Sequence, residues 1–110
     1  MSDTAHARPV HLESEADLDA FLADHDRALV EFYTEGCGIC ASMEPVLGTV
    51  ARADDNLAVG LVNPRDDPSL VDRFAVSSVP LFVLFENGTV VDRLAEGFVG
   101  AEELLAFAQG

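Results

Sequence analysis

The chain contains no lysine and no tryptophan, and it has only two cysteines. Two cysteines are too few for the disulfide framework of a small secreted protein. Long apolar runs are also missing, because the longest, at 79–85, spans seven residues and includes Pro80, whereas a membrane span needs about 20. The N-terminal segment has neither a basic start nor the apolar core of a secretory signal. We therefore expect a cytoplasmic protein with no membrane partner.

The charge of the chain is strongly one-sided. Twenty acidic residues face six arginines, for a formal net charge of -14. Such a field repels phosphate groups, which excludes nucleic acid and anionic membranes as partners. The acidic residues are spread along the whole chain, as expected of a solvated surface rather than an interaction tail. This composition resembles that of cytosolic proteins from salt-accumulating microbes, so a halophilic habitat is one hypothesis and an ordinary acidic protein is the other.

With 110 residues, the chain is long enough for one compact domain and too short for two. No internal repeat, low-complexity tract or linker interrupts it. We expect a single domain over 1–110, flexible at 1–8, in a monomeric protein.

Apolar spacing predicts an alternation of strands and helices. In chain order, the predicted elements are an extended piece at 9–12, a helix capped by Ser14 and ending near 24–26, a strand at 28–33, a helix from Cys37, a strand at 57–62, a helix at 68–74, strands at 81–85 and 89–95, and a helix at 101–109. Asn87-Gly88 predicts a type I′ hairpin, so the last two strands should pair antiparallel. The order βαβαβαββα predicts an α/β fold in which a mixed sheet carries helices on both faces.

Three of these elements carry more specific expectations. The run at 28–33 is apolar and aromatic apart from Glu31, which predicts a central, buried strand. Pro45 predicts a kink in the helix that begins at the cysteines. Helical spacing assigns an apolar face to each of the first two helices. The face of the first helix consists of Ala16, Leu18, Phe21 and Leu22. The face of the second consists of Ile39, Cys40, Met43, Val46, Leu47 and Val50.

Cys37 and Cys40 form a Cys-x-x-Cys pair where a strand meets a helix. The first cysteine would lie at the positive end of the helix dipole among unpaired N–H groups, which stabilise its thiolate, so Cys37 is the expected nucleophile. It would attack a substrate disulfide and form a mixed disulfide, which Cys40 would resolve, leaving both cysteines oxidised. Cys40 must first lose its proton in an apolar site. Glu31 on the neighbouring strand is placed to act as its base.

The same residues allow other interpretations. The two cysteines could be buried thiols that only pack. They could also supply half of a zinc or iron-sulfur site, if a second chain supplied two further ligands. His6, His11 and His25 lie in a polar region and are interpreted as surface histidines. Glu31 could point away from an edge strand, and Pro80 could simply begin a strand.

The stretch at 30–40, which reads Val-Glu-Phe-Tyr-Thr-Glu-Gly-Cys-Gly-Ile-Cys and is followed by Pro45, resembles the active-site strand, turn and kinked helix of the thioredoxin family. The segment at 74–80, ending in Pro80, and the segment at 85–88 are similar to the cis-proline loop and the hairpin of that family. Gly97 falls near a late glycine of the family. The resemblance therefore covers residues 9–109.

This resemblance implies the thioredoxin fold and a protein-disulfide reductase with no metal and no cofactor other than a redox-active Cys37–Cys40 disulfide. It implies protein disulfides as substrates and a thioredoxin reductase as electron donor. Pro80 would be a cis-proline opposite Cys37, and the backbone of Val79 would receive an extended substrate segment as an added strand. The residues implied in substrate binding are Gly36, Gly38, Ile39, Val79, Pro80 and Gly97.

Four positions depart from the family pattern. Gly36 stands where tryptophan is usual, which removes an apolar surface that meets partners. Ile39 replaces a proline between the cysteines, which makes the turn less rigid. Glu31 replaces an aspartate, and Leu61 replaces the lysine that often accompanies it, so the acid should resist ionisation more strongly. The first two departures leave a client-specific oxidant or isomerase as an alternative, beside the redox-inactive metal-bridging module.

Overall fold

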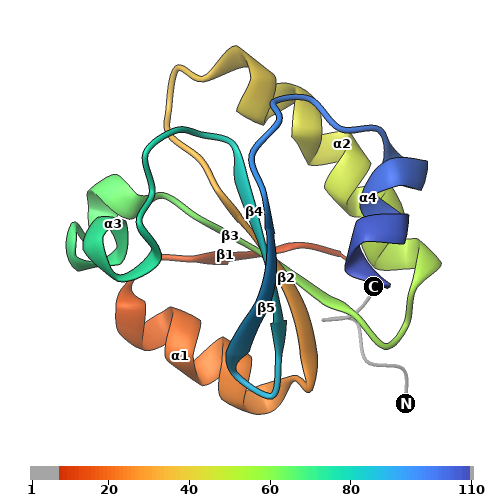
Figure 1. Ribbon diagram of the computed structural model, residues 1–110, viewed down its shortest axis with the longest axis horizontal. Helices are drawn as coiled ribbons and strands as arrows, with labels where there is room; N and C mark the ends of the chain where they lie inside the picture. The colour runs from red at the N-terminus through yellow and green to blue at the C-terminus, as the bar shows by residue number, and fades with distance from the viewer. Residues whose placement is uncertain (1–7, 110) are drawn as a thin grey trace.

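The computed structural model describes residues 8–109 and contains the predicted strands and helices in the predicted order. The elements are β1 (Val10–Leu12), α1 (Glu15–Asp24), β2 (Arg27–Phe32), α2 (Gly38–Ala53), β3 (Ala58–Val62), the 3-10 helix η2 (Pro64–Asp66), α3 (Ser69–Phe74), β4 (Leu81–Glu86), β5 (Thr89–Leu94) and α4 (Ala101–Ala108). The predicted α/β fold is confirmed (Figure 1). The expected flexible segment at 1–8 lies, apart from Arg8, outside the described residues, and so does His6.

The sheet has five strands in the order β1-β3-β2-β4-β5. β3 pairs in parallel with both β1 and β2, whereas β4 runs antiparallel to β2 and β5. The mixed sheet is therefore as predicted, and β2, the strand that leads into the cysteines, lies at its centre. A central strand has its backbone paired on both edges, so its side chains are held in a fixed register.

Local sequence signals account for the ends of several elements. α1 begins after Ser14 because the hydroxyl of this residue accepts a hydrogen bond from the N–H of Asp17 at 3.1 Å. Asn87 and Gly88 both have positive φ, at 52° and 81°, and join β4 to β5 as the hairpin prediction requires. Both predictions depend on residues adjacent in the chain, and both are confirmed.

Two apolar layers cover the two faces of the sheet, with α1 and α3 on one face and α2 and α4 on the other (Figure 1). β2 contributes to both layers, because Val30 and Phe32 pack toward α1 and α3 while Leu29 packs toward α2 and α4. Side chains alternate along a strand, so Glu31 shares the α2 face with Leu29. The buried acid is thus directed toward the helix that carries the cysteines.

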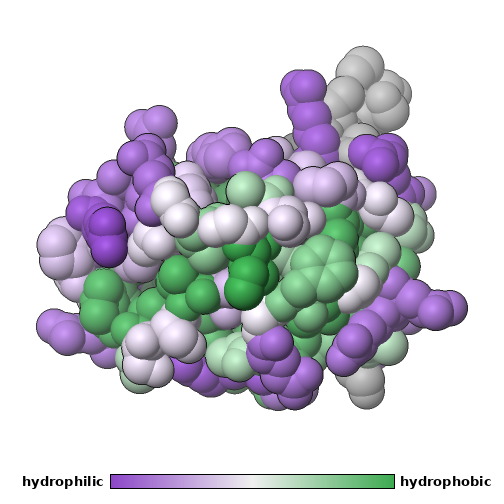
Figure 2. Space-filling model, turned by 90° about the horizontal axis from the view of Figure 1, so that it is seen from above, coloured by the Kyte–Doolittle hydropathy of each residue, from purple (hydrophilic) through white to green (hydrophobic). Residues whose placement is uncertain are grey.

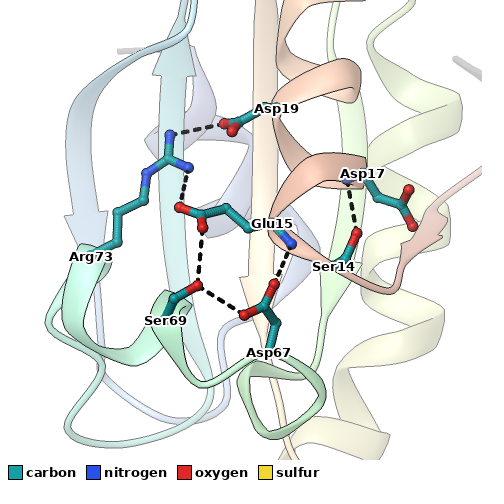
Figure 3. A network of polar contacts seen from close by, with 7 residues as sticks. All are labelled: Ser14, Glu15, Asp17, Asp19, Asp67, Ser69 and Arg73. Carbon is teal, nitrogen blue, oxygen red and sulfur yellow. Dashed lines mark hydrogen bonds and ion pairs between the residues drawn. The ribbon is translucent and has the colours of Figure 1, made fainter.

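A polar network joins α1 to η2 and α3 (Figure 3). The guanidinium of Arg73 pairs with Glu15 at 2.8 Å and with Asp19 at 2.9 Å. Asp67 accepts the N–H of Glu15 at 2.9 Å and the hydroxyl of Ser69 at 2.8 Å. Because these groups are largely exposed, the network orients α3 on the surface of the molecule and is screened by salt.

The structure also differs from the sequence predictions at two side chains and at one short helix. Ala16 and Ile39, both assigned to apolar helix faces, are exposed. The 3-10 helix η2 was not predicted, although Asn63 caps it by accepting the N–H of Arg65 at 2.9 Å. The predicted kink at Pro45 stays a prediction. Within residues 8–109, no helix is both long enough and apolar enough to cross a membrane.

Candidate functional site

A short loop carries the chain from the end of β2 to the cysteines. The N–H of Tyr33 donates to the carbonyl of Val62 at 3.1 Å, which keeps the loop attached to β3. Gly36 has a φ of 83°, a conformation that L-residues with a side chain rarely adopt, and the N–H of Cys37 donates back to the carbonyl of Thr34 at 3.4 Å. This turn places Cys37 at the N-cap of α2.

Cys37 and Cys40 form a disulfide across the first turn of α2, with a Cα–Cα distance of 5.2 Å. Cys37 is the N-cap residue of the helix, and its Sγ accepts a hydrogen bond from the N–H of Cys40 at 3.1 Å. Cys37 is half-buried, whereas Cys40 is only 4% exposed. An accessible sulfur that receives an N–H at a helix N-terminus is the arrangement that stabilises a thiolate.

Glu31 is completely buried, with 0% of its surface exposed. Its register partners are Leu61 on β3 and Phe82 on β4, so apolar side chains flank it on both sides. Neither carboxyl oxygen accepts a hydrogen bond from any described residue. Burial, and then the nearby carboxylate of Glu44, raise the pKa of Glu31 to about 8. The prediction that this acid lies in the interior is confirmed, and the raised pKa has the direction expected of an acid that resists ionisation.

A cavity of about 240 Å³ connects Glu31 with both cysteines. Its lining consists of Glu31, Tyr33, Thr34, Glu35, Gly36, Cys37, Cys40, Ala41, Glu44 and Leu61. Leu61, which stands where the family pattern often has a lysine, thus forms part of the cavity wall. Among the described residues, the lining contains three carboxyl groups and no cationic side chain. Burial, and then a set of surrounding carboxylates, also raise the pKa of Tyr33.

Glu44 is the functional candidate that sequence reasoning missed. It lies on α2 four residues after Cys40, and residues at this spacing share a face of a helix. Cys40 and Glu44 accordingly line the same cavity, opposite Glu31. The spacing was visible in the sequence, but the cavity that Glu44 shares with Glu31 depends on how α2 packs against the sheet.

The remaining predicted site residues lie at the same end of the sheet. The register pairs Phe32 with Leu81, and Phe82 with Leu94, so the loops before α2, before β4 and after β5 emerge together (Figure 1). The Val79–Pro80 peptide bond is cis, and Pro80 is buried. These two residues and Gly97 do not line the cavity that holds Glu31.

Figure 2 looks onto this end of the molecule and shows apolar side chains gathered across it. Among the exposed large apolar residues are Ile39, at 47%, on the first turn of α2, and Phe98, at 57%, next to Gly97. The N–H of Val99 contacts Sδ of Met43 at 3.4 Å, which holds the loop that carries Phe98 against α2. Gly36 and Gly38 are exposed beside Cys37.

The described residues contain no group of three or more His, Cys, Asp or Glu side chains that could hold a metal ion. His11 is exposed and makes an edge-on ring contact with Tyr33, with 6.2 Å between the ring centroids. His25, at the end of α1, makes a tilted ring contact with Phe21, with 4.9 Å between the ring centroids. Neither of the two described histidines lines the cavity that holds the cysteine pair.

Comparison with known proteins places this site in context. The family model described as Thioredoxin matches residues 9–109. A thioredoxin from Chlamydia caviae is 33% identical over 77% of this chain and 82% of that protein, and a chloroplastic thioredoxin from Arabidopsis thaliana is 35% identical over 80% of this chain but only 53% of that protein. The solved structure of a mutant thioredoxin from Halobacterium salinarum superposes with a TM-score of 0.89, at 28% identity, covering 98% of this chain and 94% of that one.

Proposed function

Because the chain belongs to the thioredoxin family and is a protein thiol-disulfide oxidoreductase with protein-disulfide reductase activity, we propose a role for each cysteine. Cys37 attacks the substrate disulfide, and Cys40 resolves the mixed disulfide that forms. The observation that carries this assignment is the position of Cys37 at the N-cap of α2, with the N–H of Cys40 directed at its sulfur at 3.1 Å. The buried position of Cys40 suits a residue that reacts only within the complex.

In the first step, the Cys37 thiolate attacks one sulfur of a substrate disulfide. A bond forms between Cys37 Sγ and that sulfur, the substrate S–S bond breaks, and the second substrate sulfur leaves with the electron pair as a thiolate. The helix N-terminus and the N–H of Cys40 favour the reactive form of Cys37, because both place partial positive charge beside its sulfur.

In the second step, Cys40 gives its proton to Glu31 and attacks Cys37 Sγ. The bond between Cys37 and the substrate breaks, the substrate sulfur leaves with the electron pair, and the product is the Cys37–Cys40 disulfide seen in the structure. The shared cavity supports this role of Glu31, since it joins the carboxyl group to both cysteines directly or through water. A pKa of about 8 makes Glu31 a base strong enough for a thiol and still partly ionised near neutral pH.

Substrate docking would use the surface that surrounds Cys37. We assign the contacts to Gly36, Gly38, Ile39, Val79, Pro80 and Gly97. The backbone of Val79 would pair with an extended substrate segment, as a strand added to an existing edge. The exposed apolar side chain of Ile39 supports this surface, and the lack of a side chain at Gly36 and Gly38 leaves Cys37 accessible.

Members of this family act on protein disulfides and need no cofactor beyond their own redox-active disulfide. We propose that a thioredoxin reductase re-reduces the oxidised form, that the protein works as a monomer in the cytoplasm, and that it is adapted to concentrated salt. The absence of lysine, the net charge of -14 and the likeness to a thioredoxin of a halophilic archaeon support the last point. A client-specific oxidant or isomerase is the alternative, favoured by Gly36 and Ile39.

The reduction of insulin disulfides by dithiothreitol tests the assignment, with wild type and Cys37→Ser compared in dilute buffer and in molar KCl. We expect catalysis by wild type alone, and more of it in KCl. The matched pair Cys37→Ser and Cys40→Ser then separates the two roles: Cys40→Ser should accumulate covalent mixed disulfides with substrates, and Cys37→Ser should not. Equal trapping by both variants would overturn the assignment, and no catalysis of insulin by wild type would favour the client-specific alternative.

A further inference from the structure

Glu31 and Glu44 are two of the three acidic side chains that line the cavity shared with the cysteines. Glu31 reaches it from β2 and is completely buried, with no hydrogen-bond partner among the described residues. Glu44 reaches it from α2 and is exposed to solvent. Leu61 forms part of the wall beside them, and among the described residues this cavity has no cationic side chain in its lining. The environment of Glu31 is thus apolar on the sheet side and acidic on the helix side.

The position of Glu44 relative to Cys40 makes the proximity of Glu44 to Glu31 relevant to the reaction. One helical turn separates the two residues, so both face the cavity from the same side of α2. Glu31 faces them from the sheet. Any change in the charge of Glu44 therefore acts on the group that is positioned to take the proton of Cys40.

We propose that Glu44 is a positioning residue for resolution, whose carboxylate controls the ionisation of Glu31 and thereby sets the pH range in which Cys40 is deprotonated. This inference rests on the proposed role of Glu31 as the base. Two carboxyl groups that share a site without a cation oppose the presence of two negative charges, so the buried member keeps its proton to higher pH. The contribution of Glu44 to the raised pKa of Glu31 supports this direction.

Other titratable groups also face Glu31 and have to be separated from Glu44 in a test. Tyr33 and Glu35, at the end of β2 and in the following loop, line the same cavity, as do the two cysteines. His11 on β1 lines the adjoining cavity together with Glu44. Leu61 and Phe82, the neighbours of Glu31 on β3 and β4, are apolar. Glu35 is the matched control, because its replacement removes the same charge from the same cavity.

The proposal predicts two linked effects of Glu44→Gln. The ionisation midpoint of Glu31 should fall by about one pH unit, the order of magnitude expected for the loss of a nearby like charge that is partly screened. A less basic Glu31 accepts a proton less readily, so the maximal rate of resolution should fall while the rate profile moves to lower pH. The profiles of wild type and Glu44→Gln should therefore cross, which a purely structural effect would not produce.

The first experiment follows the carboxyl carbon resonances of labelled glutamate by NMR during a pH titration of the oxidised protein, in which neither cysteine titrates. Glu31→Gln identifies the signal of Glu31. We expect a wild-type midpoint near pH 8, a midpoint about one unit lower in Glu44→Gln, and unchanged midpoints in Glu35→Gln and His11→Gln. An unchanged midpoint in Glu44→Gln, or an equal displacement in Glu35→Gln or His11→Gln, would overturn the proposal.

The second experiment measures the rate of resolution as a function of pH, using the release of a chromogenic thiol from a preformed mixed disulfide with Cys37. Crossing profiles of wild type and Glu44→Gln are expected, and parallel profiles would contradict the link between Glu44 and Cys40. Together, the two experiments distinguish the role of Glu31 as the base from its coupling to Glu44. If the midpoint of Glu31 moves in the NMR titration but Glu31→Gln resolves mixed disulfides as fast as wild type, then Glu31 is not the base, and the proposed function of that residue is wrong rather than its coupling to Glu44.

Discussion

Replacement of Glu31 by glutamine should change how the stability of the protein depends on pH. Glutamine keeps the size and the polarity of the side chain but cannot ionise. In wild type, the pKa of Glu31 is about 8 in the folded protein and about 4.5 in the unfolded chain. Between these two values only the folded state holds the proton, so the free energy of unfolding falls as the pH rises. Below pH 4.5 this contribution is fully present, and above pH 8 it is lost.

The size of the effect follows from the same two values. Each pH unit between them corresponds to about 1.36 kcal/mol, so the interval from 4.5 to about 8 amounts to about 5 kcal/mol at most. Glu31 is fully buried, so bulk solvent does not screen it, but water that enters the cavity on ionisation reduces the effect. Set against a total stability of about 5–15 kcal/mol for a domain of this kind, the loss is large.

Urea denaturation of the oxidised proteins, followed by circular dichroism between pH 5 and pH 9 at constant ionic strength, measures this difference. All other ionisable groups are common to both proteins, so the contributions of those that do not interact with Glu31 cancel in the comparison. Glu31→Gln should gain stability relative to wild type as the pH rises, by several kcal/mol across the range. A stability difference that stays constant within about 1 kcal/mol would refute the reasoning, because it would mean that Glu31 ionises equally easily in both states.

Two further predictions concern glycines, and both are measured by urea denaturation near neutral pH. Gly60→Ala should cost about 1–3 kcal/mol, because its Cβ would lie 3.0 Å from Cδ1 of Leu12 and 3.1 Å from a ring carbon of Phe21. Gly38→Ala is the control, because its Cβ would meet no described atom within 4 Å, and it should stay within about 0.5 kcal/mol; equal effects would contradict the packing argument. Gly36→Ala should cost about 1 kcal/mol although its Cβ would meet nothing within 4 Å, because its φ is 83°, and a neutral result would show that the turn does not require glycine.

Much of the fold could be predicted because its signals are local. The hairpin between β4 and β5 follows from Asn87-Gly88, whose positive φ angles suit few other residue pairs. The start of α1 follows from Ser14, and the central position of β2 follows from a run that is apolar on both faces. The missed 3-10 helix η2 is held by a side-chain cap at Asn63, a weaker signal that is also common in plain turns.

The candidate site was partly predictable for the same reason. The pairing of Cys37 with Cys40, and the position of both at the start of a helix, depend on a few consecutive residues. Helical spacing grouped Ile39 with the apolar face of its helix, but Ile39 is exposed, because spacing does not say which side of the first turn the sheet covers. The side of the first turn that becomes buried depends on where α2 packs against β2 and β3.

From the amino-acid sequence alone one can predict the order of the elements, the place of the cysteines at a strand-to-helix junction, and the presence of one acid within a buried strand. The packed fold adds that Glu31 has no polar partner among the described residues and that Glu44 shares its cavity. Hydrogen-bonding patterns and turn conformations are set by neighbours in the chain, whereas the ionisation of a buried group is set by what packs around it. Glu44 acts on Glu31 across the space between a helix and a sheet, and no local pattern encodes that distance.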